Sequence, residues 1–199
     1  MYERSDQAPS VKAVKIIVSG GFGVGKTTFV GAISDIEPLA TEAELTEVSV
    51  GIDDTSAVAA KSTTTVALDF GRIRLDDSLV LYLFGTPGQD RFAFLWDDLV
   101  VGALGAVVMV DTRRVMDSFA ALDYLEDHGI PFLLAINRFD GAARFDTEEI
   151  REALRIGVQV PILEFDARVR DSVKHILLTL IEQVLIFRLA GTRTPAPAY

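Results

Sequence analysis

Short apolar runs alternate with amphipathic segments along most of the chain, and this pattern predicts its elements. Runs rich in β-branched residues predict six strands, over residues 12–19, 65–72, 79–84, 106–110, 132–136 and 160–165. Helical periodicity is predicted over residues 28–36, 92–101, 116–128, 147–154 and 172–189. Strands that alternate with helices are typical of an α/β fold, in which helices cover both faces of a mostly parallel sheet. The turn residues Asp76, Asp77 and Ser78 separate two of the strands, so we expect one hairpin and one antiparallel strand.

The ends of these elements carry weaker signals. Thr147 is predicted to cap the helix over residues 147–154, and Asp171 or Ser172 the last helix. That last helix is apolar over a wide arc, which indicates a broad core face or, in part, a docking surface for a partner. Residues 37–64 are acidic and weakly periodic, and we expect a functional or mobile loop there. We also expect a flexible N-terminus at residues 1–10, a single domain over 11–190 and a disordered tail over 191–199.

The segment G-G-F-G-V-G-K-T at residues 20–27 fits the phosphate-binding pattern G-x-x-x-x-G-K-[ST]. It follows a predicted strand and precedes a predicted helix, which is the context that this motif requires. Its glycines allow consecutive backbone N–H groups to surround an anion, and the helix dipole adds positive potential. Lys26 is expected to reach the outer phosphates, and the Thr27 hydroxyl to bind Mg²⁺. A glycine-rich turn without a ligand is the alternative, and the lysine, the threonine and both flanking elements argue against it.

Composition narrows the function further. A chain of 199 residues with 49% hydrophobic content is expected to form one domain with a full core. Its net charge of -10 excludes nonspecific binding to nucleic acid and to anionic membranes, since both are themselves negative. The absence of cysteine excludes disulfides, thiolate metal sites and prenyl or palmitoyl anchors. The longest apolar run, residues 99–110, is shorter than the ~20 residues that span a bilayer, and we expect a cytoplasmic protein.

A second polar cluster reads N-R-F-D at residues 137–140, directly after a predicted strand. The Asp140 carboxylate can accept hydrogen bonds from the N1–H and the exocyclic amine of guanine, whereas adenine presents an acceptor and lacks the amine. In isolation Asn137, Asp140 and Gly141 would indicate a turn. Their position after a strand of a phosphate-loop domain instead indicates a base site that favours GTP over ATP.

With these motifs the chain resembles the Ras-like small GTPases over residues 12–189. Residues 137–140 resemble the N-K-x-D motif of that family, with Arg138 in place of the lysine that packs on the base, where an arginine can also stack. Asp166, Ala167 and Arg168 resemble the family's S-A-K motif, in which the alanine N–H meets the guanine O6. The resemblance implies a P-loop NTPase fold of the G-domain type, with GTP or GDP as ligand.

The same resemblance implies two switch segments. Residues 65–70, T-V-A-L-D-F, resemble the switch I threonine and the strand after it, so Thr65 is the candidate second hydroxyl on Mg²⁺, with Thr63 and Thr64 as alternatives. Residues 85–89, G-T-P-G-Q, resemble switch II, in which the Gly88 N–H would bind the γ-phosphate and Gln89 would position the attacking water. The implied catalytic residues are Lys26, Thr65 and Gln89, the implied metal ligands are Thr27 and Thr65, and the implied nucleotide-binding residues are Gly20, Phe22, Gly23, Val24, Gly25, Lys26, Thr27, Thr28, Gly88, Asn137, Arg138, Asp140, Asp166, Ala167 and Arg168.

Two positions depart from the family pattern. Gly85 stands where the family has an aspartate that holds a Mg²⁺-bound water, and Asp111, at the next strand end, is one candidate replacement. Phe22 occupies a loop position that is glycine in many Ras-like proteins, near the path of an activator's arginine finger. We therefore expect slow intrinsic hydrolysis and an activation that does not use that path.

Taken together, the motifs most resemble the bacterial conservon-type ATP/GTP-binding proteins, which are relatives of the polarity GTPases. That resemblance implies a roadblock/LC7-type partner, a sensor-kinase-like membrane protein and recruitment to the membrane periphery through such partners. The function it implies is a guanine-nucleotide switch in signalling that hydrolyses GTP slowly. The alternatives are a nucleotide-binding scaffold with negligible turnover, and a P-loop ATPase or small-molecule kinase.

Overall fold

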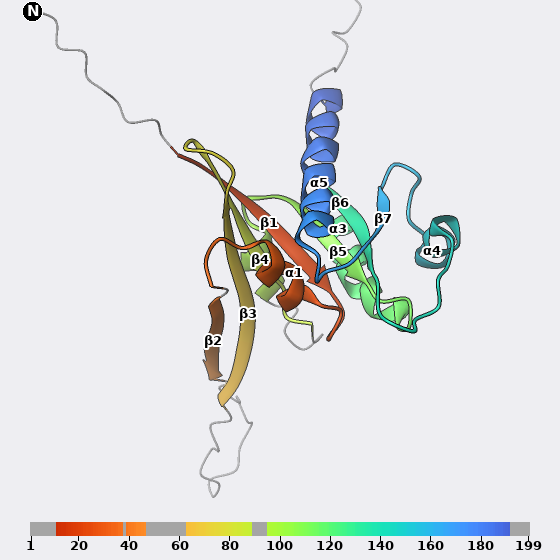
Figure 1. Cartoon of the computed structure of the whole chain (residues 1–199), viewed down its shortest axis with the longest axis horizontal. Helices are drawn as coiled ribbons and strands as arrows, with labels where there is room; N and C mark the ends of the chain where they lie inside the picture. Colours follow the sequence, from red (N-terminus) through yellow and green to blue (C-terminus); the bar gives the residue numbers. More distant parts are fainter. Residues whose placement is uncertain (1–10, 38, 47–62, 89–94, 192–199) are drawn as a thin grey trace, which may run out of the picture.

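A seven-stranded sheet in the order β2-β3-β4-β1-β5-β6-β7 runs through the described part of the chain (Figure 1). The computed structural model describes residues 11–37, 39–46, 63–88 and 95–191, with the backbone alone for 39–46, 63–67 and 190–191. The strands are β1 (Lys12–Gly20), β2 (Leu39–Thr46), β3 (Thr63–Arg74), β4 (Leu79–Gly85), β5 (Ala103–Val110), β6 (Phe132–Asn137) and β7 (Ile162–Phe165). The helices are α1 (Lys26–Ile33), α2 (Trp96–Val100), the 3₁₀ turn η2 (Val115–Ser118), α3 (Phe119–Asp127), α4 (Thr147–Leu154) and α5 (Arg170–Gly191).

The strand directions confirm the predicted fold class. β1 pairs in parallel with β4 and with β5, and β6 and β7 continue the parallel arrangement. β3 is antiparallel to both of its neighbours, β2 and β4. Among the described strands, β3 alone runs against the others, which is the one antiparallel strand that the turn at residues 76–78 predicted.

The sheet has one strand more than the six predicted. β2 lies within residues 37–64, which we expected to form a loop, so that expectation was wrong for residues 39–46; residues 47–62 lie outside the described part of the chain. Glu42 and Glu44 belong to a residue type that is depleted in strands, which hid the strand from composition. The backbone pairing of β2 with β3, in which Glu44 lies opposite Thr65, decides the conformation instead.

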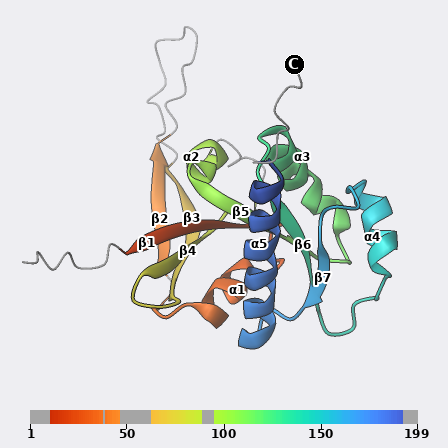
Figure 2. The same ribbon diagram turned by 90° about the horizontal axis from the view of Figure 1, so that it is seen from above.

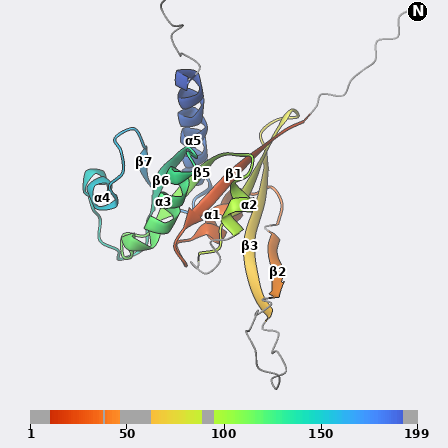
Figure 3. The same ribbon diagram turned by 180° about the vertical axis from the view of Figure 1, so that it is seen from behind.

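Each central strand contributes to two cores, because successive side chains of a strand point to opposite faces. On β5, Val107 and Met109 pack in the core beneath α1 and α5, whereas Ala106 and Val108 pack in the core beneath α2, α3 and α4. Figure 2 shows α1 and α5 on one side of the sheet and α2 and α3 on the other. Figure 3, which views the molecule from behind, shows the side that α2 and α3 cover. Since helices cover both faces, a ligand site belongs at the strand ends.

Helix α4 begins with a different cap from the one predicted. Asp146, rather than Thr147, is the N-cap: its Oδ1 accepts the Glu148 N–H at 2.9 Å. The Glu149 carboxylate in turn accepts the Asp146 N–H at 2.9 Å, which completes a capping box. Asp and Thr are both good caps, and their adjacency left the sequence ambiguous by one residue.

Helix α5 starts at Arg170, so that Asp171 and Ser172 lie in its first turn and neither of the predicted caps is the cap. The Ser172 hydroxyl instead accepts the N–H of Asp166 at 3.0 Å. No helix in the described ranges has the length and apolarity needed to cross a bilayer. The wide apolar arc of α5 is divided between buried residues, Ile176, Leu177, Leu180 and Val184, and the exposed residues Leu185, Ile186 and Phe187, so a broad core face explains only its first part.

Candidate nucleotide site

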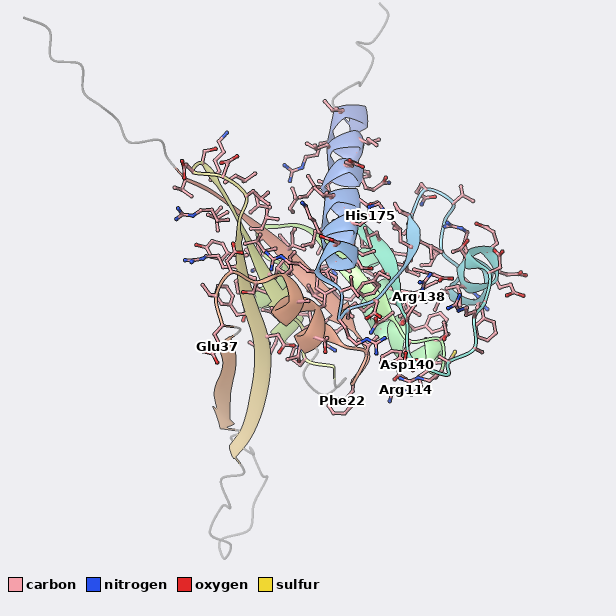
Figure 4. All side chains as sticks on the ribbon, in the orientation of Figure 1. Phe22, Glu37, Arg114, Arg138, Asp140 and His175 are labelled. Atoms are coloured by element: carbon pink, nitrogen blue, oxygen red, sulfur yellow. The ribbon has the colours of Figure 1, made fainter. Side chains whose placement is uncertain are left out.

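The carboxyl ends of β1, β4, β5, β6 and β7 meet at one end of the sheet, since these strands run in the same direction. The loops that follow β1, β5 and β6 bring Phe22, Arg114, Arg138 and Asp140 to this end of the molecule (Figure 4). Open α/β sheets bind ligands at this position. The fold therefore gathers the separate sequence motifs into one place.

The loop at residues 20–27 joins β1 to α1 in a conformation that depends on glycine. Gly25, the residue before α1, has φ 103°, and a Cβ there would lie 2.8 Å from Nδ2 of Asn137. This position therefore needs a residue without a side chain, both for its backbone angle and for its close approach to β6. The first N–H groups of α1 remain without helical partners at the mouth of the loop, which suits an anion.

Lys26 lies folded across the loop and is almost fully buried. Its Nζ donates to the carbonyl oxygens of Gly20 at 2.7 Å and of Gly21 at 2.9 Å. Burial lowers the pKa of the Lys26 ammonium to about 8, and the charge of Asp69 partly opposes that effect. An incoming polyphosphate would supply the compensating negative charge that this buried cation lacks.

A cavity of about 390 Å³ opens beside Lys26. Thr27 projects its hydroxyl to one wall, where Oγ1 donates to Asp69 Oδ2 at 2.9 Å. The cavity is lined by Phe22, Gly23, Gly25, Lys26, Thr27, Thr28, Asp69, Thr86, Pro87 and Gly88. Its walls thus come from the loop, from β3 and from the segment after β4.

The backbone of Gly88 lies directly against the loop. A Cβ at Gly88 would come within 2.8 Å of Lys26 Nζ and within 2.9 Å of the Phe22 nitrogen. This residue, predicted to bind the γ-phosphate, is therefore at the phosphate end of the site. Gln89, predicted to position water, lies outside the described residues.

At the other end of the site, Asn137 ties three segments together. Its Nδ2 donates to the Val24 carbonyl at 2.9 Å, and its Oδ1 accepts the Ala167 N–H at 3.0 Å. Asn137 is buried, and both the nitrogen and the oxygen of its side-chain amide form hydrogen bonds with protein atoms. It was predicted to contact the base, and so was the Ala167 N–H. In this structure the two residues bond to each other and join the phosphate loop to the base loops.

Asp140 is exposed and forms a two-bond ion pair with Arg168. Arg168 Nη1 lies 3.0 Å from Asp140 Oδ2, and Arg168 Nη2 lies 3.3 Å from Asp140 Oδ1. The same guanidinium contacts Asp166 at 2.8 Å. These hydrogen bonds from Arg168 lower the pKa of both carboxyl groups. Arg138, predicted to stack on a base, pairs instead with Glu164 of β7, with Nη2 2.8 Å from Oε2.

These base-end residues surround a second cavity of about 220 Å³. Its lining includes Asn137, Asp140 and Arg168 from the base loops, and Gly23, Gly25 and Thr28 from the phosphate loop and α1. The last three also line the cavity beside Lys26, so the two cavities adjoin across the loop. A ligand with an anionic tail and a planar head that offers hydrogen-bond donors matches this pair.

Asp111 does not reach the phosphate end. It is buried and holds Arg113 in a two-bond ion pair, with Oδ2 2.7 Å from Nη2. The Arg113 guanidinium then stacks 3.9 Å from the ring centre of Phe139 in the base loop. Asp111, which the sequence suggested as the replacement for an aspartate at position 85, is thus paired with Arg113 and supports residues 137–140.

Thr65, predicted as a metal ligand, is also away from the phosphate end. Its backbone lies in β3 opposite Glu44, four residues from Asp69, which is ~13 Å along an extended strand. Asp69 itself accepts a hydrogen bond from the Thr27 hydroxyl, and the sequence analysis did not identify it as a site residue. The signal was present as an acidic residue within the otherwise apolar run of residues 66–70, two positions before Gly71.

Phe22 projects from the loop with 63% of its surface exposed. Arg114, from the segment after β5, donates through Nη2 to the Phe22 carbonyl. A Cβ at the preceding Gly21 would lie 2.6 Å from Asp117 Cβ, so η2 packs tightly under the loop. The segment after β5 therefore supports the loop from outside, while the Phe22 ring stays at the rim of the phosphate cavity.

Comparison with known proteins identifies the fold and the family of the chain. In fold, the chain is similar to the G domain of FeoB from Methanococcus jannaschii, with a TM-score of 0.58 at 16% identity, over 88% of this chain and 99% of that one. It is equally similar to the G domain of the T. maritima FeoB iron transporter, with a TM-score of 0.59 at 18% identity, over 86% and 99%. In sequence, it is 30% identical over 139 residues to the uncharacterized protein MJ1339 of Methanocaldococcus jannaschii, covering 69% of this chain and 77% of that protein. The model of the family described as conserved hypothetical ATP binding proteins matches residues 18–187. The chain therefore belongs to that family, as a nucleotide-binding P-loop protein with the fold of a G domain.

Proposed function

We propose that the protein binds GTP with Mg²⁺, hydrolyses it slowly to GDP and phosphate, and acts as a guanine-nucleotide switch. The observation that carries this proposal is the pair of adjoining cavities, one ending at Lys26 and the other at Asp140. The distribution of charge supports it, since a buried cation marks one end and an exposed carboxylate the other. A guanine nucleotide carries the complementary groups at its own two ends.

The placement of each group supports the role that we propose for it. Lys26 and the N–H groups at the start of α1 would hold the outer phosphates, and Gly88 would contact the γ-phosphate. The Thr27 hydroxyl, at the wall of the phosphate cavity, suits Mg²⁺, which prefers oxygen ligands and takes the rest from phosphate and water. In the described part of the chain no cluster of three acidic or histidine side chains offers an all-protein metal site, which fits a metal held mainly by the nucleotide. Mg²⁺ would neutralise the charge that develops on the phosphates during transfer.

ATP is the second candidate, because the family is described as ATP binding. Competition of GDP and ADP against a fluorescent guanine nucleotide separates the two candidates. We expect GDP to compete more strongly than ADP. We expect Asp140→Asn to weaken the binding of GDP by about 5- to 150-fold, since an unsatisfied hydrogen-bonding group in a base site costs ~1–3 kcal/mol. Asp127→Asn, an exposed aspartate on α3, is the matched control and should bind like the wild type. Stronger competition by ADP would assign the site to ATP.

A nucleotide-binding scaffold with negligible turnover is the alternative to the enzyme, motivated by Gly85 and Phe22. Single-turnover hydrolysis of GTP at physiological Mg²⁺ decides between them. We expect the wild type to hydrolyse GTP slowly and Gln89→Ala to hydrolyse it more slowly still. The role of Gln89 rests on the sequence motif alone. A rate equal to that of free GTP in water, unchanged by the substitution, would leave only the scaffold.

Partners and location are proposed from the sequence resemblance to conservon-type proteins. We infer a roadblock/LC7-type partner and a sensor-kinase-like membrane protein, with the chain otherwise cytoplasmic and recruited to the membrane periphery through them. Affinity purification of the tagged chain, loaded either with a GTP analogue or with GDP, and identification of the proteins that co-purify with it test this inference. A roadblock-type protein recovered in one nucleotide state and not in the other supports a switch, whereas equal recovery in both states contradicts it.

A further inference from the structure

We propose that Asp69, on β3, is the carboxylate that anchors Mg²⁺ in this site, in place of an aspartate at position 85 on β4. The inference rests on the proposed nucleotide site and deepens it, because it assigns a residue that neither the family pattern nor the loop motif indicates. Asp69 would act by orienting the Thr27 hydroxyl and by accepting a hydrogen bond from water on the metal.

The strand register places Asp69 beside the vacant position. In the β3–β4 pairing Phe70 lies opposite Phe84 and Gly71 opposite Leu83, so the next pair outward is Asp69 with Gly85. Directly opposed residues of an antiparallel pair point to the same face. A Cβ built on Gly85 would lie 2.9 Å from Asp69 Cβ and 3.1 Å from Oδ2. The Asp69 side chain therefore fills the space that a side chain at position 85 would need.

Gly71, two residues after Asp69, allows helix α1 to pack close to Asp69. A Cβ on Gly71 would lie 2.6 Å from Val30 Cγ1, so α1 packs closely against β3 at this point. Thr27 lies one helical turn before Val30, on the same face of α1, and Asp69 lies two residues before Gly71, on the same face of β3. The close contact at Gly71 thus leads directly to the contact of Thr27 with Asp69.

The hydrogen bond between these two side chains has the polarity that a metal site requires. Thr27 donates its only hydroxyl proton to Asp69 Oδ2 at 2.9 Å. Its oxygen lone pairs are consequently directed away from the carboxylate and remain available to a cation. Carboxylates that accept from a metal-binding group fix its orientation and raise its basicity. Both residues line the same cavity, next to Lys26.

The test is the Mg²⁺ dependence of nucleotide binding, measured with a fluorescent GDP analogue titrated in Mg²⁺ and in EDTA. Asp69→Asn keeps the size of the side chain and removes its charge. We expect this variant to lose about 10–100-fold of the affinity gain that Mg²⁺ gives the wild type, where the gain is the ratio of each variant's own affinities in Mg²⁺ and in EDTA. Asp127→Asn should retain the full gain. Thermal unfolding of each variant reports whether it folds.

An exchange of the two residues tests the assignment independently of Asp69→Asn. Gly85→Asp alone should destabilise the fold, because its Cβ would collide with that of Asp69. Asp69→Gly together with Gly85→Asp returns the carboxylate to β4 and removes the collision. We expect the double variant to regain stability and most of the Mg²⁺ gain, and Asp69→Gly alone to lack that gain.

The outcomes separate the inference from the function beneath it. A wild type that binds no guanine or adenine nucleotide in either buffer would remove the proposed function, and the inference with it. A wild type whose affinity rises with Mg²⁺ while Asp69→Asn keeps the same rise would overturn the inference alone. A double variant that regains stability but not the Mg²⁺ gain would make Asp69 a packing residue and would also overturn it.

Discussion

Arg168 holds Asp140, the carboxylate on which the proposed guanine site depends. Its guanidinium bonds both oxygens of Asp140, and these are the atoms expected to accept from guanine. The planar N–H pair of an arginine fork resembles the N1–H and amine edge of guanine in shape and polarity. Arg168 therefore competes for the edge of Asp140 that a guanine base would need, and we expect the base to displace it.

We predict that Arg168→Ala speeds the association of GDP and raises its affinity by up to about fivefold, the limit set by the small value of exposed ion pairs. Stopped-flow fluorescence with a GDP analogue measures both quantities. Arg74→Ala, an exposed arginine near the β3–β4 turn, is the control and should leave them unchanged. A lower affinity in Arg168→Ala would mean that the arginine contacts the bound nucleotide more than it obstructs it.

Asp111 gives the fold a defined response to acid. Hydrogen bonds from Arg113 hold the pKa of this buried carboxyl below its usual value, against the opposing effect of burial. The unfolded chain then binds more protons than the folded chain in acid, so the stabilisation is present above the unfolded pKa and is lost as pH falls through the folded pKa.

We therefore predict that Asp111→Asn lowers the free energy of unfolding at pH 7 by ~1.5–3 kcal/mol, the value of hydrogen bonds to a charged group. The deficit should begin to shrink as pH falls below ~4, where the carboxyl of the unfolded wild-type chain takes up its proton, and should shrink further as pH falls through the lower pKa of the folded carboxyl. Urea unfolding at a series of pH values measures this. Asp127→Asn should follow the wild-type curve, and a deficit that stays constant down to the lowest pH would contradict the assignment.

Among the elements, α4 shows how much a short helix can depend on the residue that precedes it. It has eight residues, of which Ile150 and Leu154 are buried, so its apolar contact is small. Short helices are only marginally stable without tertiary contacts. The capping box at Asp146 and Glu149 therefore contributes part of the stability that the small apolar contact does not provide.

We predict that Asp146→Ala costs ~0.5–2 kcal/mol of stability, as loss of an N-cap typically does. Thr147→Ala is the matched control, because the sequence nominates both residues and the structure assigns the cap to Asp146 alone. Urea unfolding of the two variants distinguishes them. Equal losses would show that position 147 shares the capping role.

At the scale of the whole molecule, the parts predicted from sequence are those that local chemistry decides. Strands such as β5 are buried on both faces and therefore appear as continuous apolar runs, and the phosphate loop is a contiguous motif. Lys26 and Thr27 line one of two adjoining cavities and Asp140 lines the other, while their roles in nucleotide binding stay predictions.

The parts that sequence missed depend on which segments face each other. β2 is a strand because it pairs with β3, and its own composition argues for a loop. Asp69 matters because of its register against Gly85, which no local pattern encodes. Asp111 was nominated by its position at a strand end, whereas the pairing with Arg113 could be recognised only in three dimensions.

The pairing of position 69 with position 85 has a consequence for related proteins. Two side chains at these opposed positions would collide, so an acid on one strand should exclude an acid on the other. Across relatives the two positions are therefore expected to vary together, with aspartate on β3 accompanied by glycine on β4, and the reverse. A search for G domains that demands the acid on β4 would pass over chains of this kind, although they carry the same charge at the same point in space.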